Sequence, residues 1–249
     1  METSALIPPL PDLLLFFSFY LTVYLTAHFL IFKNWSSKLR PEAASCLISY
    51  SHGSPAVLLA GKALLSDQNR GFASANTTFQ TLVLEYSIAY FLMDLIHYLI
   101  FYPTDVLFIA HHLATLFVFM TCRFVVFHGA YAVLMLLIIA EVTSFCQNTW
   151  TLACARRKDS EFAHKVFDIL SPPFYALYTV VRGFVGPWFL YQMGVFYYSG
   201  KGGDLIPTWV WGSWLSVVFM AILVSIVWIC NLWVELYRER TRKFETKVR

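Results

Sequence analysis

Seven long apolar stretches dominate this chain of 249 residues and leave little of it for anything else. A helix that crosses the hydrocarbon core of a bilayer needs about 20 mostly apolar residues. Apolar residues make up 58% of the chain, against roughly 45–50% in soluble domains. The stretches lie near residues 12–32, 43–65, 80–101, 105–126, 129–152, 166–195 and 209–236. We therefore predict an all-α integral membrane protein built as a seven-helix transmembrane bundle.

The first stretch has the length of a membrane span, and the sixth stretch contains prolines. The stretch 12–32 is longer than the core of a cleaved signal peptide, and no basic residue precedes Lys33, so we expect it to remain as the first span. The sixth stretch contains Pro172, Pro173 and Pro187. Proline removes a backbone donor, so this stretch is predicted to be kinked or split in two.

Basic residues are distributed unequally between the two sides of the predicted bundle. Seven crossings place the loops 33–42 and 153–165 on the same side as the C-terminal tail, and most lysines and arginines lie there. The opposite side has only Lys62, Arg70, Arg123 and Lys201. By the positive-inside rule, the C-terminus is predicted to be cytosolic and the N-terminus to face the lumen or exterior.

Net charge and cysteines exclude two other classes of protein. A net charge of +3 is too small to indicate nucleic-acid binding. The five cysteines lie in or beside apolar stretches. Their odd number and their placement favour buried thiols over a secreted disulfide framework.

Placing an ionisable or polar side chain within a span costs free energy, so the side chains that occur there indicate function. The predicted orientation and a rise of about 1.5 Å per residue place several of them in the cytosolic half of the bilayer. Glu141 is placed near the midplane of the membrane. The residues placed in this way are His52, Asp94, His97, His111, His112, Glu141, Ser144 and Asn148. We predict that they converge on a common intramembrane chamber.

The spacing of these residues predicts which side chains share a helix face. Asp94 and His97 are three residues apart, so the carboxylate is expected to orient the ring. Glu141, Ser144 and Asn148 form a polar stripe with helical periodicity. Both patterns would turn polar groups toward one side of their helix.

The adjacent rings of His111 and His112 point about 100° apart. One ring can face a chamber squarely while the other reaches it from the side or contacts a neighbouring helix, and Thr115 shares a face with both. Imidazole and carboxylate groups suit zinc or iron, but adjacent histidines on one helix do not readily hold one ion together, so other helices would have to supply ligands. No metal is predicted, and no cofactor is predicted either.

Each of these residues also has a structural interpretation. A single intramembrane histidine such as His52 or His97 is commonly a hydrogen-bond partner between helices. Arg182, deep in the sixth stretch, needs a partner, and Glu85 lies at a comparable depth. We predict a structural ion pair between Arg182 and Glu85, with Glu141 as the alternative partner.

Three segments in order resemble the TLC-domain family, which includes ceramide synthases and TRAM proteins. They are Asp94 to His97, Ile109-Ala-His-His-Leu-Ala-Thr115 and Ala140-Glu-Val-Thr-Ser144. Tyr90-Phe-Leu-Met-Asp94 and Arg182-Gly-Phe-Val-Gly-Pro187 resemble the TLC domain-containing protein 4 group in particular. The resemblance covers about residues 40–236. It implies a six-helix membrane domain over 41–236, preceded by the N-terminus, first helix and loop (1–40) and followed by a basic cytosolic tail (237–249).

In ceramide synthases, paired histidines and two downstream aspartates carry N-acylation of a sphingoid base by acyl-CoA. The resemblance matches His111 and His112 to the pair, and Glu141 and Ser144 to the aspartate positions. Serine has no charge with which to hold an imidazole. This departure favours lipid binding over catalysis.

We therefore predict a membrane protein of lipid homeostasis that binds or senses a lipid in a cavity open to the cytosolic leaflet. The alternatives are a ceramide synthase-like acyltransferase that uses acyl-CoA, and then a transporter or receptor. Candidate catalytic residues are His111, His112 and Glu141; candidate substrate-binding residues are His52, Asp94, His97, Thr115, Ser144 and Asn148. The resemblance implies the endoplasmic reticulum, with the Golgi or plasma membrane as alternatives.

The predicted topology can be tested at Asn34, which begins an Asn-Trp-Ser glycosylation sequon. Because its loop is predicted to be cytosolic, we expect no glycan there. Mass spectrometry of protein expressed in a glycosylating host checks this, and an occupied Asn34 would contradict the predicted orientation.

Overall fold

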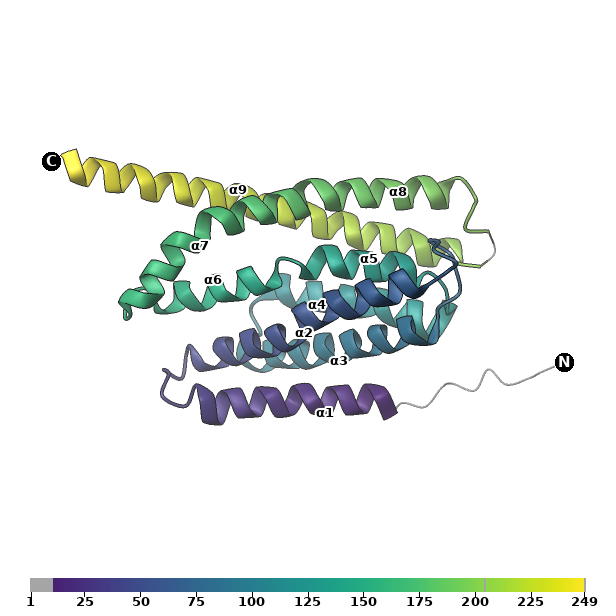
Figure 1. Cartoon of the computed structure of the whole chain (residues 1–249), viewed down its shortest axis with the longest axis horizontal. Helices are drawn as coiled ribbons and strands as arrows, with labels where there is room; N and C mark the ends of the chain where they lie inside the picture. The colour runs from purple at the N-terminus through teal and green to yellow at the C-terminus, as the bar shows by residue number, and fades with distance from the viewer. Residues whose placement is uncertain (1–10, 204, 249) are drawn as a thin grey trace.

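Figure 1 shows the protein as an elongated bundle of helices in a computed structural model that describes residues 11–203 and 205–248. The α-helices are α1 (Pro11–Thr26), α2 (Arg40–Ser66), α3 (Thr78–Phe101), α4 (Val106–Met120), α5 (Ala130–Glu141), α6 (Ser144–Arg156), α7 (Glu161–Val180), α8 (Gly186–Tyr198) and α9 (Thr208–Val248). Three π-helical segments extend or join them: η1 (Ala27–Ile31), η2 (Thr121–Val126) and η3 (Val181–Val185). Segments that continue one another form single spans: α5 with α6, and α7 with η3 and α8. Counted in this way, the predicted all-α, seven-helix architecture is confirmed.

Five of the helical segments are long and apolar enough to cross a membrane, in the part of the chain that the structure describes. They are Asp12–Ile31, Thr78–Phe101, Val106–Val126, Ala130–Arg156 and Thr208–Thr241. The other two predicted spans form helix α2 and the series α7, η3 and α8. The protein is therefore an integral membrane protein.

The connections gather at the two ends of the bundle. The loop between α1 and α2, the turn between α6 and α7 and the end of α9 lie at one end, on the left of Figure 1. At the other end, Ala75 before α3 forms a bridge pair with His128 before α5. This arrangement agrees with seven crossings, while the leaflet that each end faces stays a prediction from charge.

Side chains cap several helices where the sequence provides them. Thr77 begins α3 with a capping box, in which its hydroxyl accepts from Gln80 N (3.2 Å) and Gln80 Oε1 accepts from Thr77 N (2.9 Å). The hydroxyl of Ser160 caps α7 by accepting from Ala163 N. These bonds satisfy backbone donors that have no partner within the helix.

The fifth and sixth spans are both irregular. The fifth was predicted as one continuous helix, but it is interrupted at Val142 and Thr143, between α5 and α6. In the sixth span, α7 bends (Figure 1) and contains Pro172 and Pro173, and η3 joins it to α8. The prolines therefore explain the kink predicted for the sixth span, whereas no glycine or proline lies at the interruption of the fifth span.

The amide of Asn76 locks the end of the bundle near the bridge pair. Its Nδ2 donates to the Cys122 carbonyl (2.9 Å), and its Oδ1 accepts from Ala130 N (2.9 Å). Its backbone N–H donates to the Phe127 carbonyl. One side chain thus fixes the start of α3 against both the start of η2 and the start of α5.

Glu85 on α3 forms a buried ion pair with Arg123 on η2, and both side chains are almost inaccessible. The Arg123 Nε donates to Glu85 Oε1 at 2.7 Å. The predicted pair between Glu85 and Arg182 is therefore wrong. Arg123 was counted among residues at a membrane end, but it turns inward and reaches the carboxylate first.

We expect Glu85→Gln to lower the free energy of unfolding by about 3–5 kcal/mol, because it leaves the Arg123 charge buried without its partner. The matched control is Arg157→Gln, which breaks the partly exposed pair with Glu239 and should cost about 0–1 kcal/mol. Unfolding of the purified protein in detergent measures both. Equal losses in the two variants would contradict this account of the buried pair.

Candidate functional site

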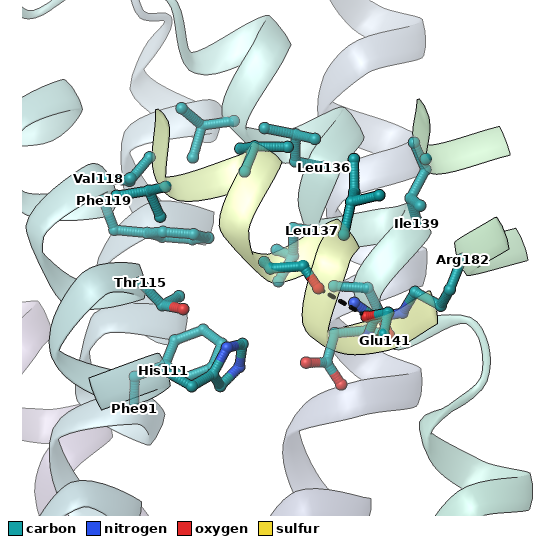
Figure 2. A pocket seen from close by; sticks show the side chains of 18 residues that line it. Phe91, His111, Thr115, Val118, Phe119, Leu136, Leu137, Ile139, Glu141 and Arg182 are labelled. Atoms are coloured by element: carbon teal, nitrogen blue, oxygen red, sulfur yellow. Dashed lines mark hydrogen bonds between the residues drawn. The ribbon is translucent and has the colours of Figure 1, made fainter. Parts of the chain in front are cut away.

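A cavity of about 130 Å³ lies between α4, α5, η3, α8 and α9. Figure 2 shows His111 and Thr115 on one side of it and Glu141 and Arg182 on the other. Val118, Phe119, Leu136 and other apolar residues form the rest of the wall. The cavity therefore has a polar end and an apolar end.

His111 lines this cavity and is nevertheless an exposed residue. The cavity is therefore not sealed beside α4, and its polar end communicates with the outside of the bundle.

The neighbouring His112 points elsewhere and has both ring nitrogens engaged. Its Nδ1 lies 2.8 Å from the Phe108 carbonyl, and its Nε2 lies 2.9 Å from Asp94 Oδ2. Since a carbonyl only accepts, Nδ1 must carry a proton, and a second proton lies between Nε2 and the carboxylate. His112 is thus a fixed ring held by Asp94, and His111 is the ring that faces the cavity.

Asp94 is the centre of this small network. Its Oδ1 accepts from Ser45 Oγ at 2.7 Å, so α2, α3 and α4 meet at one buried carboxylate. The expectation that Asp94 orients His97 is wrong. The ring of His97 instead contacts Tyr24 OH on α1 through Nδ1 at 2.9 Å, which is the structural interpretation of an intramembrane histidine.

His52 lies behind Glu141, on the side of α2. It is fully buried and stacks on Tyr90 with ring centroids 4.0 Å apart. Its Nε2 contacts Ser87 Oγ at 3.1 Å, and its Nδ1 lies 3.9 Å from Glu141 Oε2 without a hydrogen-bond partner in the described part of the chain. The same Oε2 accepts from Ser144 Oγ at 2.5 Å.

A glycine permits this arrangement. A Cβ atom at Gly53 would lie 2.9 Å from Glu141 Oε2 and 2.9 Å from Ser144 Cβ, so α2 approaches the junction of α5 and α6 with its bare backbone. The interruption there also changes the use of the Ala140 carbonyl. In an unbroken helix it would pair with the N–H of Ser144, but here it accepts from Arg182 Nη2 at 2.7 Å.

The structure therefore sorts the predicted site residues into groups. His111, Thr115 and Glu141 line the cavity. His52 and Ser144 contact or approach Glu141, and Asp94 and His112 bind one another beside His111. His97 and Asn148 lie in separate helix contacts, since Asn148 Nδ2 donates to Ser49 Oγ at 2.8 Å.

Sequence reasoning missed Ser45 and assigned Arg182 a structural role, although Arg182 lines the cavity. A signal for Ser45 was present, because Ser45, Ser49 and His52 repeat at helical spacing on α2. No group of three or more His, Cys, Asp or Glu residues suited to a metal occurs among the described residues. That the protein binds no metal or cofactor stays a prediction.

Comparisons with known proteins agree on one family. The TRAM/LAG1/CLN8 family model, described as the TLC domain, matches residues 14–234 and so includes the helices around the cavity. A TLC domain-containing protein of Arabidopsis thaliana is 61% identical over 233 residues, which are 93% of this chain and 92% of the relative. No solved structure matches the chain.

We expect Gly53→Ala to destabilise the protein by about 1–3 kcal/mol, because the added methyl group collides with Glu141 and Ser144. Gly61→Ala on the same helix is the control, since nothing lies within 4 Å of its added Cβ. Alanine should leave stability unchanged there or raise it by up to about 1 kcal/mol. Thermal unfolding in detergent compares the two, and equal effects would show that the close approach at Gly53 is unimportant.

Proposed function

The chain belongs to the TLC-domain family, and on that premise we propose that it binds a membrane lipid in the cavity between α4, α5, η3 and α9. One observation carries the proposal: the polar lining of the cavity is confined to one end, and the remaining wall is apolar. Lipid sites combine an apolar wall with a few polar groups that orient the head. Binding of this kind serves lipid homeostasis in the host membrane.

His111 is proposed to contact the lipid head. It faces Glu141 across the cavity, and its ring nitrogens are not fixed in the way that those of His112 are. Thr115 adds a hydroxyl on the same wall, one helical turn along α4. In this proposal Asp94, His112, His52 and Ser144 support the polar end and do not touch the lipid.

The lipid is proposed to enter from the cytosolic leaflet of the endoplasmic reticulum. Two features support entry from the cytosolic leaflet. His111 is exposed near the start of α4, and the basic residues are predicted to lie on the cytosolic side. The organelle follows from the family resemblance, and the Golgi and plasma membrane remain as alternatives.

Acyl transfer from acyl-CoA to a lipid amine or hydroxyl is the second candidate. The observation in its favour is that an imidazole and a carboxyl group face one another across the cavity. His111 would take the proton of the attacking amine or hydroxyl as it adds to the thioester carbonyl, and coenzyme A would leave as the thiol. Ser144, where the resemblance implies an aspartate, bonds Glu141 and brings no second charge.

His111→Ala tests both candidates in purified protein. We expect it to reduce co-purifying lipid by roughly three- to tenfold, as expected for a lost hydrogen bond of about 1 kcal/mol, measured by native mass spectrometry. His97→Gln is the control, since it removes an intramembrane imidazole that contacts Tyr24 on α1 and the rings of Phe101 and Tyr102 at the end of α3, which do not line the cavity.

An acyl-transfer assay with long-chain acyl-CoA separates binding from catalysis. Turnover that is present in the natural protein and His97→Gln but lost in His111→Ala supports the enzyme. Retained lipid without turnover supports the binding protein. If the natural protein holds no lipid and shows no turnover, both candidates fail.

A further inference from the structure

Arg123 and Arg182 lie in membrane helices but differ in how they are partnered. Arg123 is paired with the carboxylate of Glu85 through its Nε and Nη2. The Nη2 of Arg182 donates to the Ala140 carbonyl, but its Nε is buried without a hydrogen-bond partner in the described part of the chain. A guanidinium has five N–H donors, so Arg182 brings unused donors to the cavity that it lines.

Glu141 brings unused acceptor sites to the same polar end. Its Oε2 accepts from Ser144, but a carboxylate offers about four lone-pair sites. Among the described residues no ion pair joins Glu141 to Arg182, whose guanidinium instead lies 5.6 Å from the ring centroid of Tyr178. The two groups therefore do not satisfy one another directly.

Together these groups define the head that fits best. A carboxylate or phosphate head would gain at Arg182 but would meet the like charge of Glu141, and an ammonium head would meet the reverse situation. An uncharged head with a carbonyl for Arg182 and a hydroxyl for Glu141 meets neither repulsion. A zwitterionic head, with its anion on Arg182 and its ammonium group on Glu141, avoids both repulsions as well, and the competition test below therefore includes one. The cavity of about 130 Å³ has room for such a head and the start of one acyl chain.

We infer that the ligand is a neutral single-chain lipid of the monoacylglycerol type, with its ester carbonyl on Arg182 and a hydroxyl on Glu141. This inference rests on the proposed function, because it assigns the head of the lipid proposed to occupy the cavity. The apolar chain then lies against Phe119, Leu136 and Ile222 on the walls formed by α4, α5 and α9.

The test uses radiolabelled 1-monooleoylglycerol and the full chain in detergent. Two unlabelled competitors each remove one kind of group: the 1-O-oleyl glycerol ether lacks the carbonyl, and methyl oleate lacks the hydroxyls. Three others have charged heads: oleate is anionic, oleylamine is cationic, and 1-oleoyl-lysophosphatidylethanolamine is zwitterionic. We expect the ether and methyl oleate to bind at least about tenfold more weakly than the monoester, since each lacks a hydrogen bond to a charged group. The charged competitors should bind no better than methyl oleate.

Variants then assign each group to its residue. Arg182→Gln should abolish the preference for ester over ether, and Glu141→Gln should reduce the preference for the monoester over methyl oleate. Arg157→Gln, outside the cavity, should keep both ratios. Because each ratio is measured within one variant, the fraction of protein that is folded cancels.

The outcomes separate this inference from the proposal beneath it. If no probe binds the natural protein, the lipid-binding function fails and the inference fails with it. If oleate, oleylamine or the zwitterionic lysolipid binds most tightly, a lipid site is present but its head is charged, and the inference is overturned. An ester-over-ether preference that survives in Arg182→Gln overturns the assignment of Arg182.

Discussion

The close passage of α2 across the junction of α5 and α6 is the constraint on which the polar end of the cavity depends. At Gly53 the backbone of α2 lies so close to the side chains of Glu141 and Ser144 that even a methyl group would collide with them. The junction interrupts the fifth span, and the Ala140 carbonyl is thereby free to accept from Arg182. The carboxyl group and the guanidinium that line the cavity thus both lie at this junction, one against α2 and the other on the freed carbonyl.

The adjacent histidines have separate roles because of helix geometry. Consecutive residues point about 100° apart, so His112 reaches Asp94 in the bundle interior while His111 faces the cavity. Asp94 also holds Ser45, so the fixed ring belongs to a contact among three helices.

The sequence predicts the elements well and their partners poorly. Hydropathy and length located the seven helices, and prolines indicated the irregular sixth span. Spacing placed Asp94 and His97 on one face, but it could not say which helix lies opposite that face, and the carboxylate binds His112 while His97 binds Tyr24. Glu85 likewise pairs with Arg123 because helix packing, which single-sequence spacing does not encode, brings that arginine inward.

The hydrogen bonds of the Asn76 side chain have a consequence for biosynthesis. Asn76-Thr-Thr is a glycosylation sequon on the side predicted to be lumenal, yet the folded protein uses both atoms of the amide group to hold Cys122 and Ala130. A sugar on Nδ2 would compete with this contact, and once α5 has docked the amide is occupied. The fraction of chains that carry a glycan at this asparagine would therefore record how quickly α5 reaches its place after α3 has entered the membrane.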